Sequence, residues 1–139
     1  MTNDTIREAS CACGRLKLRL AGDPQYVSSC ACQACQRRSG SPFGVAAFFN
    51  KDQVAGQDGE ARVFRRTAES GNQVTYRFCP ECGSSVWWEP EAMPERVAVA
   101  GGAFADPNFP APQRMVWTDY KAAWVRPAEG VPLFPRAPT

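Results

Sequence analysis

The stretch "QVTYRFCPECGSSVWWE", residues 73–89, places two cysteines between two segments that have the composition of β-strands. Apolar and polar residues alternate over residues 73–78, which is the two-residue period of a half-buried strand. Residues 85–89 are rich in Val and Trp, types enriched in strands. Gly83 directly follows the second cysteine, and a sharp metal-binding turn needs the positive φ that glycine adopts easily. The stretch therefore predicts a strand, a cysteine turn and a second strand.

A second turn of the same form lies near the start of the chain. In "CACG", residues 11–14, a glycine again follows the second cysteine, and the alternating sequence "LKLRL" comes next. Four thiolates form the closed tetrahedral set of a structural zinc ion. We therefore expect the two turns to be halves of one structural zinc site, with the ligands Cys11, Cys13, Cys79 and Cys82.

Further short segments rich in Val or aromatic residues are bounded by Gly, Pro, Asp or Asn, and they predict strands at residues 16–20, 43–49, 61–66, 96–104 and 114–120. The stretch "KDQVAGQDGEA", residues 51–61, contains turn residues and predicts a connection. Only a helical turn or two beginning near Cys32 is expected. The sequence thus predicts a mainly β fold of short antiparallel strands stapled by zinc. In a strand, Trp87 and Trp88 point to opposite faces, so at least one is expected at a pocket or at the surface.

The length of 139 residues, with 44% of them hydrophobic, suits one domain, which we place at residues 1–125. Residues 126–139 hold four prolines and predict an extended tail or a strap over the domain.

The charges of the 16 basic and 14 acidic residues nearly cancel, so we expect no nucleic-acid partner. No apolar run is long enough for a bilayer, and the N-terminus lacks the apolar region of a secretory signal. We expect a cytoplasmic protein with no membrane partner.

Seven cysteines in a reducing compartment indicate metal binding rather than disulfides. Three remain after the structural set, in "CACQACQRRSG", residues 30–40, and the chain has no histidine. We therefore expect Cys30, Cys32 and Cys35 to hold a second zinc ion with one open position, the pattern of a catalytic or ligand-binding site. A reactive or redox-active thiol group ranks second, and an iron–sulfur cluster ranks third because such clusters usually need four thiolates at other spacings.

An all-sulfur zinc site with an open position favours a soft guest, and an incoming thiol would bind as its thiolate. Bound there, a small thiol can add to an aldehyde or release one. Arg37 and Arg38 follow the triplet and either offset its negative charge or bind a substrate carboxylate, although two solvated arginines are as good an interpretation. Without histidine, the proton carrier is a carboxylate such as Asp119, a tyrosine such as Tyr120, a lysine or water.

The motifs "SCACGRLKLRL", "CACQACQRRSGSPFGVAAFF", "YRFCPECGSSVWW" and "VAVAGGAFADP" occur in this order between residues 10 and 107, within a resemblance that runs over residues 10–124. In this respect the chain resembles the glutathione-dependent formaldehyde-activating enzyme family, also called the centromere protein V domain family. The resemblance implies a β-tent fold of the Mss4 type, a four-cysteine structural zinc, and a second zinc at the Cys-x-Cys-x-x-Cys triplet. Many relatives have His between the first two cysteines of that triplet, where this chain has Ala31.

The resemblance also implies a carbon–sulfur lyase reaction in which S-hydroxymethylglutathione interconverts with glutathione and formaldehyde. We therefore expect a zinc enzyme that binds a small thiol, glutathione or a similar compound, and makes or breaks its adduct with an aldehyde substrate. The alternative is a non-catalytic, zinc-stabilised binding module or thiol carrier. A content of two zinc ions per chain would favour the open site over a single structural ion.

Overall fold

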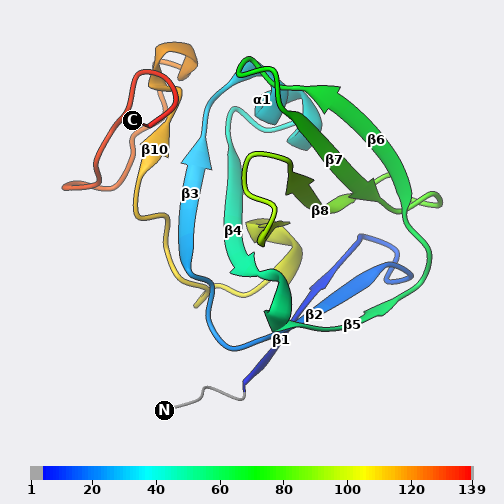
Figure 1. Cartoon of the computed structure of the whole chain (residues 1–139). Coiled ribbons are helices and arrows are strands. Elements are labelled where there is room, and N and C mark those ends of the chain that lie inside the picture. Colours follow the sequence, from blue (N-terminus) through cyan, green and yellow to red (C-terminus); the bar gives the residue numbers. More distant parts are fainter. Residues whose placement is uncertain (1–4, 139) are drawn as a thin grey trace.

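The computed structural model describes residues 5–138. Ten strands, one α-helix and three short 3-10 helices follow one another along this part of the chain (Figure 1). The strands are β1 (Ile6–Ser10), β2 (Lys17–Ala21), β3 (Tyr26–Cys30), β4 (Gly44–Asn50), β5 (Val54–Asp58), β6 (Arg62–Thr67), β7 (Gln73–Phe78), β8 (Ser85–Pro90), β9 (Arg96–Ala100) and β10 (Met115–Val116). The helices are α1 (Gln33–Ser39), η1 (Lys51–Gln53), η2 (Gly101–Phe104) and η3 (Thr118–Tyr120).

The strands form two sheets. The smaller has the order β1-β2-β5, and the larger has the order β10-β3-β4-β9-β8-β7-β6. All pairs are antiparallel except β10 and β3, which run parallel. The larger sheet curves strongly, so that β3 and β4 face β6 and β7 across the molecule, with the smaller sheet at one end and α1 at the other (Figure 1). The predicted mainly β class is confirmed, and the parallel pair is the exception to its antiparallel pattern.

The alternating segments form strands close to their predicted positions. Residues 73–78 are β7 as predicted, and the segments at 43–49, 61–66 and 85–89 are shifted or extended by one residue. The expected helical turn after Cys32 is α1, which Cys32 caps by accepting a hydrogen bond from the amide of Cys35. The predicted strand at 96–104 ends at Ala100, since η2 follows it. The predicted strand at 114–120 is reduced to the two residues of β10.

One predicted connection is wrong, because residues 54–58 of the stretch 51–61 form β5. This strand lies at the edge of the smaller sheet and, among the strands of residues 5–138, pairs with β2 alone. Four of its five residues are exposed, and the pairing shifts register at Arg19 and Leu20. A polar, exposed edge strand has no buried face, so no alternation of apolar and polar residues marks it in the sequence.

Two hydrophobic clusters occupy opposite faces of the larger sheet. Trp87 packs in the cluster between the two sheets with Leu18, Phe49 and Val99, while Trp88 belongs to the cluster on the other face with Tyr76. The two tryptophans point to opposite faces as predicted. Both are buried, at 5% and 7% exposure, and Trp87 lines a pocket with Leu18 and Val54, so the pocket position expected for one of them is present.

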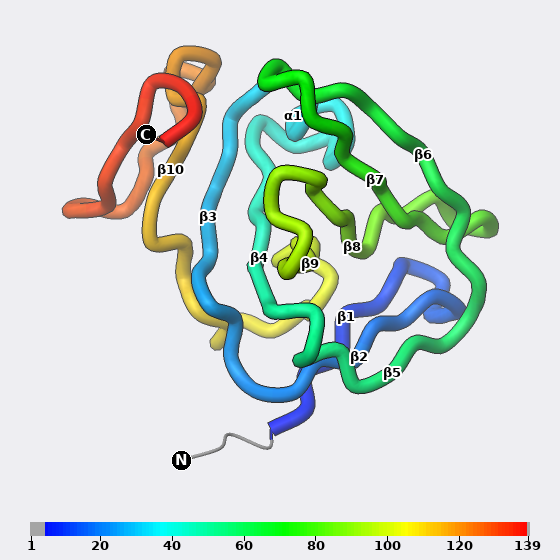
Figure 2. The backbone as a smooth tube through the Cα atoms, viewed as in Figure 1, coloured from blue at the N-terminus to red at the C-terminus, as the bar shows by residue number. Residues whose placement is uncertain are grey.

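The C-terminal residues run back along β10 on the outer side of β3 (Figure 2). The amide of Met115 donates to the carbonyl of Pro132, and the amide of Phe134 donates to the carbonyl of Met115. The amide of Trp117 donates to the carbonyl of Arg136. These backbone hydrogen bonds hold residues 132–136 against the domain as a strap.

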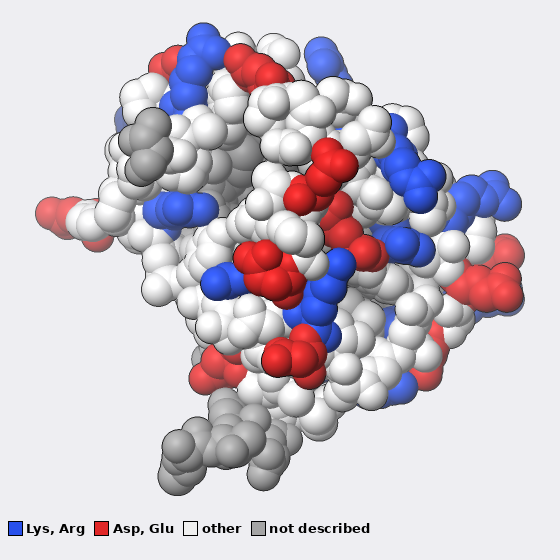
Figure 3. All heavy atoms as spheres, in the orientation of Figure 1, with Lys and Arg blue, Asp and Glu red and all other residues white. Residues whose placement is uncertain are grey.

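Basic and acidic side chains are interspersed on the face drawn in Figure 3, in keeping with the nearly balanced charge of the chain. Within residues 5–138, no helix combines the length and the apolar character needed to cross a bilayer.

Candidate metal centres and their cavities

The four cysteines that we assigned to a structural zinc lie together at one place in the fold. Their sulfur atoms all lie within 4.8 Å of one another. The Cys11 and Cys13 sulfurs are 3.7 Å apart, as are those of Cys13 and Cys79. Two sulfurs on one tetrahedral zinc are about 3.8 Å apart when the zinc–sulfur bonds are about 2.3 Å. The spacing therefore fits a zinc ion, and it is far too long for a disulfide, whose bond is about 2.05 Å.

Each half of this group is a tight turn between paired strands. In both turns the amide of the first cysteine donates to the carbonyl of the residue five positions later, from Cys11 to Leu16 and from Cys79 to Ser84. The predicted positive φ is present at both glycines, 82° at Gly14 and 78° at Gly83. The glycines thus allow the backbone to fold around the sulfurs without the strain that a side chain would cause.

Hydrogen bonds connect the two turns and lower the pKa of one of their thiols. The amide of Ala12 donates to the hydroxyl oxygen of Ser84 at 3.1 Å, which links the turn after β1 to the turn after β7. The amide of Leu16 donates to the sulfur of Cys11 at 3.2 Å. Hydrogen bonding with Ser84 lowers the pKa of Cys82 to about 5. A lowered pKa favours the thiolate form that binds a metal.

The triplet of Cys30, Cys32 and Cys35 forms a separate group at the end of β3 and the start of α1. Its three sulfurs lie within 4.8 Å of one another, and no other Cys, Asp or Glu of the described residues joins them. Helical geometry explains the grouping, because Cys32 caps the helix and Cys35 lies one turn further along it. Three soft donors at this spacing fit a zinc ion that keeps one position open.

The three thiols influence one another strongly. Hydrogen bonding with Cys32 and Cys35, together with burial, raises the pKa of Cys30. Hydrogen bonds from the Cys30 and Cys35 thiols are the main cause of a lowered pKa at Cys32, and the positive charge of Arg66 adds to it. The lowered pKa of Cys32 favours its thiolate, which is the form that a soft cation recognises.

Ala31, between the first two cysteines, belongs to the hydrophobic core. It is fully buried and packs with Met115 and Val125 in a small core cluster under the C-terminal segment. The residue at this position therefore lies in the core of the domain.

Two arginines lie beside the triplet. The Arg38 guanidinium lies 4.1 Å from the centre of the Trp88 ring, and a Cβ atom on Gly44 would come within 2.6 Å of its Nη2 atom. The Nε of Arg66, on β6, donates to the hydroxyl oxygen of Tyr76 at 3.1 Å. The chain sequence pointed to Arg37 and Arg38 because they follow the cysteines. The sequence contained no sign of Arg66, because only the curvature of the larger sheet brings its edge strand β6 to the end of the molecule where α1 lies.

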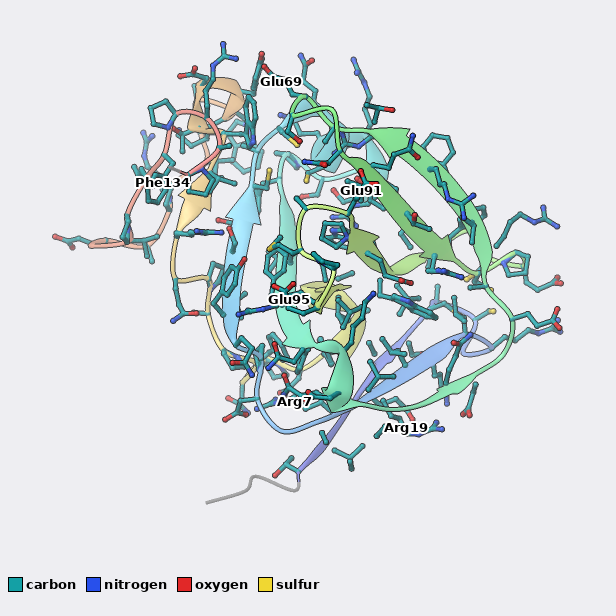
Figure 4. All side chains as sticks on the ribbon, viewed as in Figure 1. Arg7, Arg19, Glu69, Glu91, Glu95 and Phe134 are labelled. Atoms are coloured by element: carbon teal, nitrogen blue, oxygen red, sulfur yellow. The ribbon has the colours of Figure 1, made fainter. Side chains whose placement is uncertain are left out.

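Two cavities adjoin the triplet. The smaller, of 320 Å³, includes Cys32, Arg66, Glu69 and Tyr120 in its wall. The larger, of 740 Å³, lies between α1 and the strands β6 and β7, with Arg37 and Arg38 on its helical side. Gln33, Ala34 and Arg66 belong to the walls of both. Glu69 lies at the same end of the molecule as α1, whereas Arg7 and Arg19 lie at the opposite end (Figure 4).

The proposed proton carriers differ in position. Tyr120 lines the cavity at Cys32. The carboxylate of Asp119 instead lies 3.5 Å from Nε of Arg136 in an exposed ion pair. The Lys121 ammonium donates to the carbonyls of Ala122 and Val125. Among these three side chains, Tyr120 is the one at the site.

Comparison with known proteins adds two findings. A family model described as "Glutathione-dependent formaldehyde-activating enzyme" matches residues 6–120. A crystal structure of a Rhodobacter sphaeroides protein is similar in fold, with a TM-score of 0.55, 16% sequence identity, and coverage of 91% of this chain and 98% of that chain. A search of curated proteins found no significant match.

Proposed function

The chain belongs to the glutathione-dependent formaldehyde-activating enzyme family, and we propose that it is a zinc-dependent, carbon–sulfur lyase-like enzyme acting on a small thiol and an aldehyde such as formaldehyde. The thiol is glutathione or a similar compound. The observation that carries this proposal is the grouping of three sulfurs, from Cys30, Cys32 and Cys35, beside a cavity that reaches Cys32. A thiol in that cavity would lie beside the three cysteines that would hold the metal.

We propose two zinc ions per chain. Cys11, Cys13, Cys79 and Cys82 would hold the structural ion, and Cys30, Cys32 and Cys35 would hold the other. When bound at the triplet, zinc supplies an open coordination position at which a thiol loses its proton. The residues around the triplet then bind and orient the thiol and the aldehyde.

In the forward direction the thiol releases its proton to water, and the thiol sulfur forms a bond to the aldehyde carbon. The electron pair of the carbonyl π bond moves to the oxygen, which takes up a proton to give a hydroxyl group. Tyr120 is well positioned to donate this proton, because it lines the cavity at Cys32. Water then restores the proton of Tyr120. In the reverse direction Tyr120, after it has lost its proton to water, accepts the hydroxyl proton as the carbon–sulfur bond breaks, and the released thiolate takes up a proton from water. No oxidant or reductant is needed.

The surroundings of the triplet suit a site that carries negative charge. Three thiolates exceed the charge of one zinc ion, and Arg66 and Arg38 lie next to them. The aromatic residues Tyr76 and Trp88 hold these guanidiniums and exclude water from one side of them. Positive charge at fixed positions stabilises both the thiolates and the oxygen that becomes negative during addition.

The experiment is to mix zinc-loaded protein with glutathione and formaldehyde and to measure the exchange between free and adduct forms by NMR. We expect the protein to accelerate exchange and the Cys35→Ser variant to lose the acceleration while keeping its fold. A rate equal to the protein-free rate would contradict the enzymatic proposal. Thiol binding without acceleration would instead favour a thiol carrier.

A further inference from the structure

The Arg66 side chain lines both cavities beside the triplet. The smaller cavity contains Cys32, and the larger extends from Arg66 across Gln33 and Ala34 toward Arg37 and Phe64. A molecule whose sulfur lies at the triplet therefore has its remaining atoms next to Arg66. Arg66 is the charged residue that the walls of the two cavities share.

The Arg66 side chain is fixed at one end and available at the other. Its Nε donates to the hydroxyl oxygen of Tyr76, and Tyr76 is itself buried, at 6% exposure, against Trp88. Among residues 5–138, neither Nη atom of Arg66 makes a hydrogen bond or an ion pair. Because the guanidinium is planar, anchoring Nε fixes the direction in which the two Nη groups point. Two parallel N–H donors form the fork that binds a carboxylate or a phosphate.

The charged residues around the two Nη groups of Arg66 are mainly basic. The wall of the larger cavity contains three arginines, Arg37, Arg38 and Arg66, and no acidic residue. Glu69 is the acidic residue in the wall of the smaller cavity, and it lies 3.4 Å from Nη1 of Arg136. In the described part of the chain no ion pair involves any of the three arginines. No carboxylate of the described residues pairs with these arginines, and the negative charge that acts on Arg66 and Arg38 is that of the triplet's thiols.

Exposed Phe64 provides the apolar part of the same wall. It is 60% exposed and stacks on Tyr76 with 6.4 Å between the ring centres. A bound molecule would cover this ring while its anionic group meets the arginines. A ligand with a thiol, a short organic chain and an anionic group matches all three features of the two cavities.

We infer that Arg66 is a specificity-determining residue that selects thiols with an anionic group, a carboxylate or a phosphate, through the fork that Tyr76 holds in place. This inference rests on the proposed function, since it places the thiol sulfur at Cys30, Cys32 and Cys35. It adds the recognition of the other end of the thiol. Tyr76 acts as a positioning residue, because it reaches the ligand only through Arg66.

The test uses two pairs of thiols that differ only in their anionic groups, with zinc-loaded protein and isothermal titration calorimetry. Glutathione is compared with its diethyl ester, and 4′-phosphopantetheine is compared with pantetheine. We expect the wild-type protein to bind one or both anionic members about 10-fold to 100-fold more tightly than the blocked members, as hydrogen bonds to charged groups predict. The pair with the larger ratio identifies the anion as a carboxylate or a phosphate.

Variants then assign the selectivity to Arg66. Arg66→Gln should bring the ratio of the affinity for the anionic thiol to that for the blocked thiol close to one. Tyr76→Phe should reduce this ratio by a smaller factor, because the Arg66 guanidinium loses the hydrogen bond that orients it. Arg66→Lys keeps the charge without the fork and should retain part of the ratio. Arg65→Gln is the matched control, since Arg65 is the exposed neighbour on β6 and belongs to the wall of neither cavity. Metal content and melting temperature, measured for each variant, identify any that fails to fold.

Three results would overturn the inference. Equal binding of anionic and blocked thiols by the wild-type protein would refute anion selection while leaving the proposed function intact. An equal loss of affinity for both members of a pair in Arg66→Gln would show that Arg66 only supports the structure. If none of the four thiols binds to the zinc-loaded protein, the proposed function fails and the inference fails with it.

Discussion

The sulfur atoms of Cys13 and Cys79 lie 3.7 Å apart, although 66 residues separate the two cysteines in the chain. Cys13 belongs to the turn between β1 and β2 of the smaller sheet, and Cys79 follows β7 of the larger sheet. A metal ion shared by these turns would therefore join the two sheets and close a long loop. Such an ion contributes its binding free energy to folding.

The two cysteine groups should differ in their effect on stability. Cys79→Ser removes a sulfur from the group that joins the sheets, so we expect loss of one zinc and of cooperative unfolding. The apparent binding free energy of a structural zinc, about 10–16 kcal/mol, matches or exceeds the whole stability of a typical domain, about 5–15 kcal/mol. Cys35→Ser should lose the other zinc and change the melting temperature by only a few degrees. Equal destabilisation in thermal melts would contradict this division.

The backbone shape of each cysteine turn should require the glycine that follows its second cysteine. Gly83 has a φ of 78° with no atom within 4 Å of a built Cβ, so Gly83→Ala adds strain without a clash. We expect a cost of about 1–2 kcal/mol in the free energy of unfolding. Gly102→Ala is the control, because Gly102 has neither a positive φ nor a close neighbour. Chemical denaturation that shows the same cost for both would refute the role of the positive φ.

The sequence predicted much of this fold because local pattern and local chemistry decide it. The alternation in residues 73–78 and the glycine after Cys82 mark β7 and its turn in the sequence itself. The four cysteines could be paired across the chain because their two turns have the same form. The exposed strand β5 left no pattern, since its residues do not alternate between core and solvent.

Parts of the site that depend on tertiary contacts could not be predicted in this way. Arg66 and Tyr76 meet because β6 pairs with β7, and the sequence alone does not show that this pair faces α1. Tyr120 was one of several expected proton carriers, and only the folded chain separates it from Asp119. Local pattern thus identifies metal ligands more readily than it identifies the residues around them.

Tyr120→Phe should slow the reaction without weakening thiol binding. The substitution removes the hydroxyl group that we propose as the proton carrier and keeps the ring in the cavity wall. General acid–base catalysis contributes about 100-fold or more, so we expect a decrease in exchange rate of about that size. Tyr26→Phe is the control, because the Tyr26 hydroxyl contacts Met93 instead of the site. An unchanged NMR exchange rate in Tyr120→Phe would contradict the role of Tyr120 as the proton carrier.

Gly44→Ala should displace Arg38 from Trp88. A Cβ at residue 44 would lie 2.6 Å from Nη2 of Arg38, and the flexible guanidinium is the part that can move. We expect a change in tryptophan fluorescence, since the guanidinium now lies 4.1 Å from the Trp88 ring centre. The same substitution in a Trp88→Phe background should give no such change. A fluorescence change that persists in that background would show that the effect arises at another tryptophan.

The most direct test of the open metal site is a crystal structure of the zinc-loaded protein with glutathione, with zinc located by anomalous scattering. We predict one zinc bound by Cys11, Cys13, Cys79 and Cys82, and a second bound by Cys30, Cys32 and Cys35 with the glutathione sulfur as its fourth ligand. A second zinc closed by a fourth protein side chain, or a triplet that binds no metal, would contradict the account.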